Sequence, residues 1–445
     1  MNKLIFIILI FLLLAIKITH QRDRDFKPLL VSLFIISVPL VISFELYKVK
    51  SESPSGTLST VFFLNTPLIL YFTSLLFFKR RSISFNYQDN KLELAIILLA
   101  IISLINPENQ LRGATLVFVY FIFSYFVLFK LIIDNLSANQ IFKGIYDGIA
   151  LLSILQFFLA IMFPLLNIKE VTDIFHNEGG IWSTRDGTRP GAVGIFSHPG
   201  NLALYTMMTS TFLLSCYCCG LKKRMSVFFI LINTGTLFLT YSRTSYLTYI
   251  VAMFTVYFIG SNRRFNLFSL KNLLRFVLPL VLVLVWVVYY SPLSDIFLKS
   301  DSNEMFDARL IHWTLGFKLF TLHPLIGVGI NSHLEYIAKN MLLFDNGSIP
   351  SFFWQNPIHN IHLIILVEQG LLGFLVWIIY VVLNIVNAQR AVNAGKNMLF
   401  PLWTIGVVIS FFLYGLTGWA PLSPSILPLF LFVIYFSSKL KNKIL

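Results

Sequence analysis

Charged residues are scarce in this chain of 445 residues, at 12% of the total, whereas hydrophobic residues make up 57%. Soluble globular domains have about 25% charged residues, so the composition does not fit a soluble enzyme. Runs of about 18 or more apolar residues are typical of transmembrane helices. The composition therefore indicates a polytopic integral membrane protein.

Cysteine is nearly absent as well, and the three that occur are Cys216, Cys218 and Cys219. They stand too close in sequence to pair readily, and CYCC lacks the spacing of zinc ligands, so we expect inert thiols. The sequence also lacks HEXXH, GxGxxG, Walker and GxSxG motifs. We therefore expect no metal ion and no other cofactor.

About thirteen apolar runs follow one another along the chain, without an internal repeat. They cover residues 4–18, 29–46, 61–78, 92–105, 114–134, 144–166, 201–219, 226–240, 244–260, 273–291, 361–384, 398–416 and 424–437. No small-residue cleavage site follows the first run, so we interpret it as a helix and not as a signal peptide. The pattern predicts an all-α membrane protein with about 12–13 transmembrane helices.

The net charge of +14 comes from basic clusters that occupy alternate loops, among them Lys79–Arg81 and Lys222–Arg224. Basic loops face the cytoplasm in membrane proteins, so the positive charge predicts which loops are cytoplasmic. Since this explains the charge, we expect no nucleic-acid partner. The C-terminus is then cytoplasmic. Two long loops, 167–200 and 291–357, fall on the outer face.

The second outer loop contains a predicted helix that begins near Asp301 and ends at Pro324 and Gly327. Asp301 and Glu304 have capping-box spacing. An apolar stripe of five residues recurs at spacings of three and four: Phe306, Leu310, Trp313, Phe317 and Phe320. We expect this helix to lie flat on the outer leaflet or to plug the mouth of the bundle.

Polar residues gather on the same outer face. Seven of the 8 histidines lie there, namely His176, His198, His312, His323, His333, His359 and His362. Arg243 separates two apolar runs almost without a loop, so it should lie at the membrane boundary. It is either a headgroup anchor or a guanidinium fork for a phosphate.

The stretch NPIHNIHLIILVEQGLLG places polar residues directly before an apolar helix. His359 and His362 are three residues apart and share a face, and they lack further ligands at metal-binding spacing. Gly370 and Gly373 lie below them in the same direction, which predicts a groove for a neighbouring helix or a lipid tail. Glu368 lies on the opposite face, and we expect it to accept a hydrogen bond from another helix.

Two segments together resemble the O-antigen ligase and O-antigen polymerase superfamily. They are RLIHWTLGFKLFTLHPLIGVGIN, from Arg309, and HNIHLIILVEQGLLG, from His359. SHPGNLALY and YSRTSYL also look like elements of the family. The resemblance covers about residues 185–375. It aligns the His–Asn pair of the family motif with His359 and Asn360.

The resemblance implies a GT-C-like bundle and a metal-independent glycosyltransferase whose donor is an undecaprenyl-diphosphate-linked glycan. It implies catalytic roles for His359, Arg309 and Arg243, with His359 as general base. The residues expected to bind substrate are Arg189, His198, Asn201, Asn360, His362, Trp313 and His323. The implied partners are the lipid-linked oligosaccharide, membrane lipids, and the chain-length regulator and flippase of the same pathway.

The chain divides into four predicted regions: helices 1–166, the first outer loop and central helices 167–290, the large outer loop 291–358, and helices 359–445. We expect a bacterial cytoplasmic membrane protein whose catalytic loop faces the periplasm. The favoured function is polymerisation of lipid-linked repeat units, because SHPGN looks more like polymerases. The alternatives are ligation of the glycan to lipid A core, transport, and a scaffold for envelope assembly.

Overall fold

The computed structural model describes residues 27–39, 91–166, 182–183, 190–196, 198–261, 281, 302–344, 356–395 and 397–440. The helices are α2 (Lys27–Ser37), α4 (Lys91–Ile105), α5 (Arg112–Asn135), α6 (Ala138–Leu166), α8 (Pro199–Cys218), α9 (Lys223–Leu239), α10 (Arg243–Ser261), α13 (Ser302–Leu322), α14 (His333–Lys339), α15 (Met341–Phe344), α17 (Ile361–Asn393), α18 (Leu399–Gly415) and α19 (Leu427–Leu440). A 3-10 turn, η2 (Ala420–Leu422), precedes α19. Two-residue strands β1 (Trp182–Ser183) and β2 (Pro190–Gly191) pair antiparallel, and the sequence did not predict them.

Within the described ranges, four helices are long and apolar enough to cross a membrane: α5, α6, α10 and α17. Large apolar side chains such as Ile105, Phe123 and Leu231 are exposed on the outside of the bundle. A hydrocarbon phase would cover such side chains without cost. The prediction of an all-α polytopic membrane protein is confirmed, while the predicted runs 4–18 and 61–78 lie outside the described residues.

Helix α8 is the centre of the bundle, and almost every residue from Gly200 to Cys216 is buried. It packs against α9, α10 and α18. Its hydroxyl groups turn back onto its own backbone, as when Ser215 donates to the carbonyl of Thr211 at 2.7 Å. Small and hydroxyl-bearing residues let membrane helices approach closely, which explains how a helix this polar stays inside the bundle.

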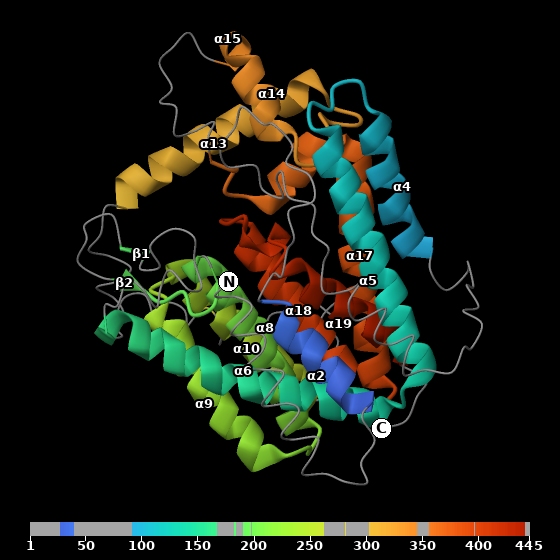
Figure 1. The fold of residues 1–445 in the computed structure, drawn as a ribbon, viewed down its shortest axis with the longest axis vertical. Coiled ribbons are helices and arrows are strands. Elements are labelled where there is room, and N and C mark those ends of the chain that lie inside the picture. Colours follow the sequence, from blue (N-terminus) through green and yellow to red (C-terminus); the bar gives the residue numbers. More distant parts are fainter. Residues whose placement is uncertain are drawn as a thin grey trace.

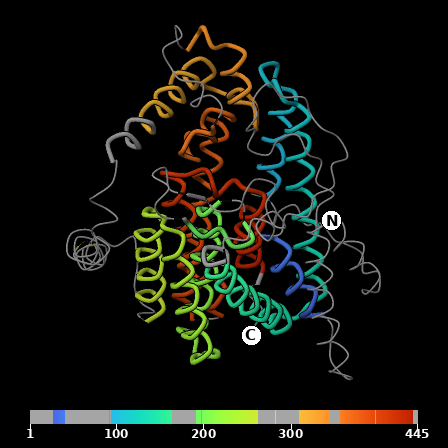
Figure 2. The backbone as a smooth tube through the Cα atoms, turned by 60° about the vertical axis from the view of Figure 1, so that its left-hand side comes forward, coloured from blue at the N-terminus to red at the C-terminus, as the bar shows by residue number. Residues whose placement is uncertain are grey.

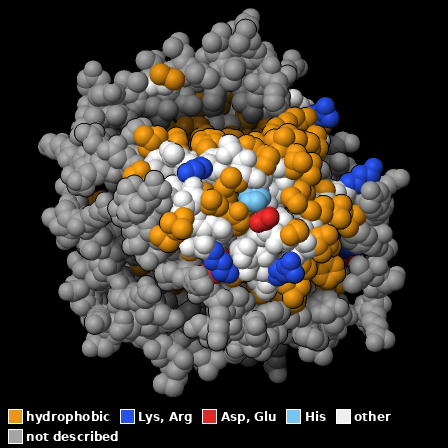
Figure 3. Space-filling view, turned by 90° about the horizontal axis from the view of Figure 1, so that it is seen from above, with side chains coloured by type: hydrophobic (Ala, Val, Ile, Leu, Met, Phe, Trp, Pro, Cys, Tyr) orange, Lys and Arg blue, Asp and Glu red, His pale blue; other side chains and the backbone are white. Residues whose placement is uncertain are grey.

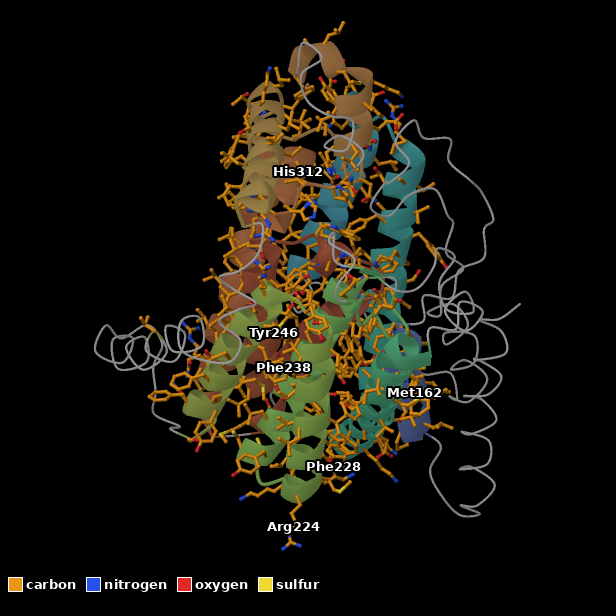
Figure 4. The ribbon with its side chains drawn as sticks, turned by 90° about the vertical axis from the view of Figure 1, so that its left-hand side faces the viewer. Met162, Arg224, Phe228, Phe238, Tyr246 and His312 are labelled. Carbon is orange, nitrogen blue, oxygen red and sulfur yellow. The ribbon has the colours of Figure 1, made fainter. Side chains whose placement is uncertain are left out.

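Helices α13, α14 and α15 lie at one end of the long axis, and α9 lies at the other (Figure 1). The tube in Figure 2 shows α13 crossing the end of α17. In Figure 4, His312 of α13 lies near one end of the molecule and Arg224 at the opposite end. The histidine-rich end and the basic Lys222–Arg224 turn are therefore on opposite sides, as the charge pattern predicted.

The helix predicted in the outer loop is confirmed as α13, but the face that it buries is different from the predicted one. His312, Leu315, Gly316 and Leu319 are buried, and a Cβ atom at Gly316 would press on Leu363 of α17. Of the predicted stripe, Leu310 and Phe317 are exposed, whereas Trp313 and Phe320 are partly buried against the core that contains Leu315 and Leu319.

Two members of the predicted stripe illustrate this, since Leu310 is 50% and Phe317 is 55% exposed. Figure 3 looks onto this end of the molecule, where apolar side chains occupy much of the described surface. Apolar periodicity identified the helix correctly. It gave the wrong face because apolar residues point outward as well as inward in a membrane protein.

The loop after α13 is hydrogen-bonded to α17 at a break in that helix. Gly370 has φ 65° and ψ −167°, which interrupts the helix. The amide of Gly329 donates to the carbonyl of Glu368 at 2.8 Å, and the amide of Leu371 donates to the carbonyl of Pro324 at 2.8 Å. A Cβ atom at Gly370 would collide with the backbone of Leu325. The groove predicted at Gly370 for a neighbouring helix or a lipid tail is therefore filled by this loop.

Candidate functional site

Three histidines from three separate elements meet near the end of the bundle where α13 lies, and we name them the histidine cluster: His198, His312 and His359. His198 is the N-cap residue of α8, His312 lies on α13, and His359 precedes α17. The ring centroids of His312 and His359 are 5.2 Å apart. His198 is close enough to His359 for the two rings to influence one another electrostatically.

The histidine cluster is held in the neutral state. Burial lowers the pKa of His198 to about 4 and that of His312 to about 3. Burial also lowers the pKa of His359, and the positive charge of Arg309 lowers it further. A neutral imidazole has a ring nitrogen that can accept a proton. The cluster can therefore supply a general base at neutral pH.

Arg309 provides a fixed positive charge beside this base. It lies three residues before His312 on α13, so the two side chains share a face. It is half-buried, and its charge acts on His359 and on the hydroxyl group of Tyr414 in α18. Guanidinium groups are not deprotonated in proteins. A neutral base next to a permanent cation suits a reaction that removes a proton and releases an anion.

The N-terminus of α8 is shaped to bring His198 into the cluster. The Nδ1 atom of His198 accepts a hydrogen bond from the amide of Gly200 at 2.9 Å, which caps the helix. A side chain at Gly200 would collide with the hydroxyl of Tyr414. The His198 ring also lies 5.9 Å from the ring of Trp419. The glycine thus allows α18 to end against the start of α8.

Arg243 enters the same end of the bundle through the turn between α9 and α10. It is the first residue of α10 and is half-buried, which confirms its predicted place between two helix ends. The preceding residue, Ser242, is within hydrogen-bonding reach of Tyr414. Since Tyr414 is also close to Arg309, Arg309 and the residue before Arg243 approach Tyr414 from different helices.

Asn201 lies in the first turn of α8 and is 2% exposed. Its Nδ2 atom donates to the hydroxyl of Ser423 at 3.4 Å. Asn201 therefore lies one turn after His198 on α8, in contact with the segment that links α18 to α19. Arg189, also predicted to bind substrate, lies outside the described residues.

Asn360 and His362 have structural partners. The Oδ1 atom of Asn360 accepts hydrogen bonds from the amides of His362 and Leu363, at 3.0 and 3.1 Å, and so caps α17. The Nε2 atom of His362 lies 3.1 Å from the carbonyl oxygen of Phe412, and its Nδ1 atom accepts from the indole of Trp377 at 3.2 Å. Both ring nitrogens of His362 are thus occupied, which favours His359 as the base.

Trp313 and His323 lie at different distances from the cluster. Trp313 follows His312 on α13 and is half-buried, and its indole nitrogen has no hydrogen-bond partner in the part of the chain that the structure describes. His323 lies 2.8 Å from the hydroxyl of Tyr336 through its Nε2 atom. It is 11 residues beyond His312, or roughly 16 Å along a helix, so it belongs to the junction of α13 and α14.

Sequence reasoning gave no functional role to His312 or Tyr414, which the structure brings to the site. The spacing of three between Arg309 and His312 was a signal for the first, whereas nothing in the sequence pointed to the second. Sequence reasoning placed Glu368 correctly as an acceptor, since it pairs with His333 of α14. Among the described residues, no group of three or more His, Cys, Asp or Glu is arranged to hold a metal ion.

Comparison with known proteins gives one family match. A family model described as O-Antigen ligase matches residues 227–378. No curated protein matches the chain. The matched segment begins in α9 and ends in α17, and so includes Arg243, Arg309, His312 and His359. Residues 227–378 are therefore similar to the O-antigen ligase family, whose members are glycosyltransferase-like enzymes.

Proposed function

We propose that this protein polymerises lipid-linked oligosaccharide repeat units. The observation that carries the proposal is the neutral His359 beside the charged Arg309, at the end of the molecule opposite the basic turn. The donor is a growing glycan on undecaprenyl diphosphate, and the acceptor is a sugar hydroxyl of the incoming repeat unit.

His359 removes the proton from the acceptor hydroxyl, and the oxygen then attacks the anomeric carbon of the donor. The bond between that carbon and the diphosphate oxygen breaks, and undecaprenyl diphosphate leaves as an anion. Arg309 and Arg243 bind the diphosphate and stabilise the charge that develops on it. The reaction needs neither a nucleotide sugar nor a metal ion in this scheme.

The remaining predicted residues have supporting roles in this proposal. His198, Asn201 and Trp313 contact the sugars in this proposal: His198 lies close to the base, Asn201 lies one turn after His198 on α8, and Trp313 follows His312 on α13. Arg189 is proposed as a further diphosphate ligand. His323, Asn360 and His362 have protein partners, so they shape the site and do not touch the substrate. The lipid chain lies against the exposed apolar helices.

The site faces the periplasm in this proposal, and the protein resides in the bacterial cytoplasmic membrane. Cysteine substitutions at Thr321 on α13 and at Arg224 test the orientation. A membrane-impermeant thiol reagent should label the Thr321 variant in intact cells and the Arg224 variant only after permeabilisation. The reverse pattern would place the base on the wrong side for this reaction.

The acceptor distinguishes polymerase from ligase, and the match of residues 227–378 to the O-antigen ligase family makes the ligase the second candidate. The purified protein in nanodiscs is given undecaprenyl-diphosphate-linked repeat units, with or without lipid A core. A polymerase lengthens the lipid-linked glycan without the core. A ligase releases undecaprenyl diphosphate only when the core is present. The chain-length regulator and flippase are the proposed partners in the cell.

A further inference from the structure

The segment between α18 and α19, residues 416–426, has no role in the scheme above, and we name it the α18–α19 link. It contains the 3-10 turn η2, with Trp419 directly before the turn and Ser423 directly after it. The family match ends at residue 378, so the match assigns nothing to these residues. What the link can do therefore follows from its contacts.

Hydrogen bonds join the link to two helices that carry residues of the proposed site. The hydroxyl of Thr417 donates to the hydroxyl of Thr244 at 3.1 Å, and Thr244 directly follows Arg243 on α10. At the other end of the link, the amide of Asn201 in α8 donates to the hydroxyl of Ser423 at 3.4 Å. The link thus spans from the start of α10 to the start of α8.

Trp419, in the middle of the link, lies beside the histidine cluster. The centroid of its ring is 5.9 Å from that of His198. The Trp419 side chain also packs against the apolar core between α13 and α17, which includes Leu315 and Ile358. Ile358 directly precedes His359. Since Trp419 is only half-buried, part of this large aromatic side chain stays accessible near the proposed base.

Buried amide and hydroxyl groups lie one turn beyond Trp419. Ser423 and Ser425 are 6% and 4% exposed, and their hydroxyl oxygens are 2.8 Å apart. The Oδ1 atom of Asn201 is buried and has no hydrogen-bond partner among the residues that the structure describes. It belongs to the same amide group that donates to Ser423, so this acceptor lies beside the link. A buried acceptor without a donor is costly, so a ligand with a hydroxyl group to donate fits here.

We propose that the α18–α19 link binds a pyranose ring of the lipid-linked glycan, an inference that rests on the function proposed above. The C–H groups on one face of the sugar stack on the Trp419 ring, whose face carries partial negative charge. The sugar hydroxyls exchange hydrogen bonds with Asn201, Ser423 and Ser425, which can both donate and accept. An aromatic ring with a few neutral polar groups suits an uncharged polar ligand, whereas the diphosphate requires arginines.

The donor and the acceptor both carry such a ring, and two half-blocked substrates distinguish them. The donor-only substrate is a lipid-linked glycan whose terminal sugar is methylated, so that it has no hydroxyl to attack with. The acceptor-only substrate is a lipid-linked repeat unit with a CH₂ group in place of the glycosidic oxygen, so that it cannot be transferred. Neither turns over alone, so the Kd of each can be measured with the full-length protein in nanodiscs.

Trp419→Leu tests the stacking contact. It should weaken the binding of at least one half-blocked substrate about tenfold, the loss expected when a large aromatic contact is removed. The substrate that is weakened shows whether the link holds the donor sugar or the acceptor sugar. The Kd for undecaprenyl diphosphate, which has no sugar, should stay unchanged. Trp419→Phe keeps an aromatic face and should lose less than Trp419→Leu.

The matched control is Leu422→Ala, because Leu422 lies in the same link and packs against the same core without a polar or aromatic group. It should lower the melting temperature and leave all three Kd values unchanged. The proposal is overturned if Trp419→Leu binds both half-blocked substrates like the wild type, or if it weakens undecaprenyl diphosphate equally. If Trp419→Leu does not fold, the same criteria apply to Trp419→Phe and Ser423→Ala.

Transfer between the two half-blocked substrates, mixed with the wild-type protein, is a separate measurement. If no transfer occurs, the proposed function fails. The Kd values of the Trp419 variants still test the sugar contact in that case, so the two failures are distinguishable.

Discussion

The middle of α13 and the loop after it meet the α17 region in different ways. In the middle of α13, the ring of His312 lies 5.2 Å from that of His359, and Arg309 is close enough to lower the pKa of His359. After α13, the loop is joined to α17 by backbone hydrogen bonds around Gly370. The first contact is made by ionisable side chains and the second by backbone groups. The residues that resemble the family therefore fall into two groups, a cluster of ionisable side chains in the proposed site and a rigid junction.

The largest expected effect is at the proposed base. Replacing His359 with alanine removes the proposed base, which should lower the turnover of purified lipid-linked substrate by about 10²–10⁴-fold. Donor binding should change little, because the arginines hold the diphosphate. Turnover and donor binding are measured in nanodiscs. Near-normal turnover would mean that catalysis depends on charge stabilisation by the arginines alone.

Arg243→Lys tests the guanidinium fork. Lysine keeps the charge but cannot form two parallel hydrogen bonds. Turnover should fall about tenfold to a hundredfold, since one charge-assisted hydrogen bond contributes about 1.5–3 kcal/mol. The control is Arg224→Lys at the opposite end, which should be fully active. A fully active Arg243→Lys variant would return Arg243 to the role of a headgroup anchor.

Gly370→Ala tests the rigid junction. A residue with a side chain in this backbone conformation is destabilised by about 1–3 kcal/mol, and here the Cβ atom also meets the backbone of Leu325. The melting temperature should fall clearly more than in the control Gly395→Ala, where φ is 71° but no atom lies within 4 Å. Equal melting temperatures for the two variants would show that the junction contributes nothing.

The smallest effect on turnover is expected for His362→Ala. Its ring bonds to Trp377 and Phe412, and each hydrogen bond contributes about 0.5–1.5 kcal/mol to stability. We expect a lower melting temperature with turnover per folded molecule within about twofold of the wild type. An inactive variant that melts like the wild-type protein would make His362 the base in place of His359.

Most helices could be predicted from the sequence. The apolar run 114–134 became α5 and the run 244–260 became α10, each within two residues at either end. Long apolar runs determine helices in a membrane because unpaired backbone groups are too costly there. The break at Gly370 was not predicted, because it depends on a loop that is distant in sequence.

The site was predicted only in part. Arg309 and His359 were identified from the resemblance, and the structure places them together. His362 was grouped with His359 because the two share a helix face, yet it turns toward Trp377 and Phe412. Tyr414 could not be predicted, because α13 and α18 are far apart in sequence and only the fold brings Tyr414 close to Arg309.

The sequence by itself determined the class of this protein and most of its helices, since these follow from the length of the apolar runs. The placement of basic residues predicts an orientation, which stays a prediction. Tertiary structure decided which of two histidines three residues apart has protein partners on both nitrogens and which lies beside a cation. It also paired Glu368 with His333, 35 residues away. Hydrogen bonds and charges act over a few ångströms, so their partners depend on how the helices pack and cannot be read from spacing along the chain.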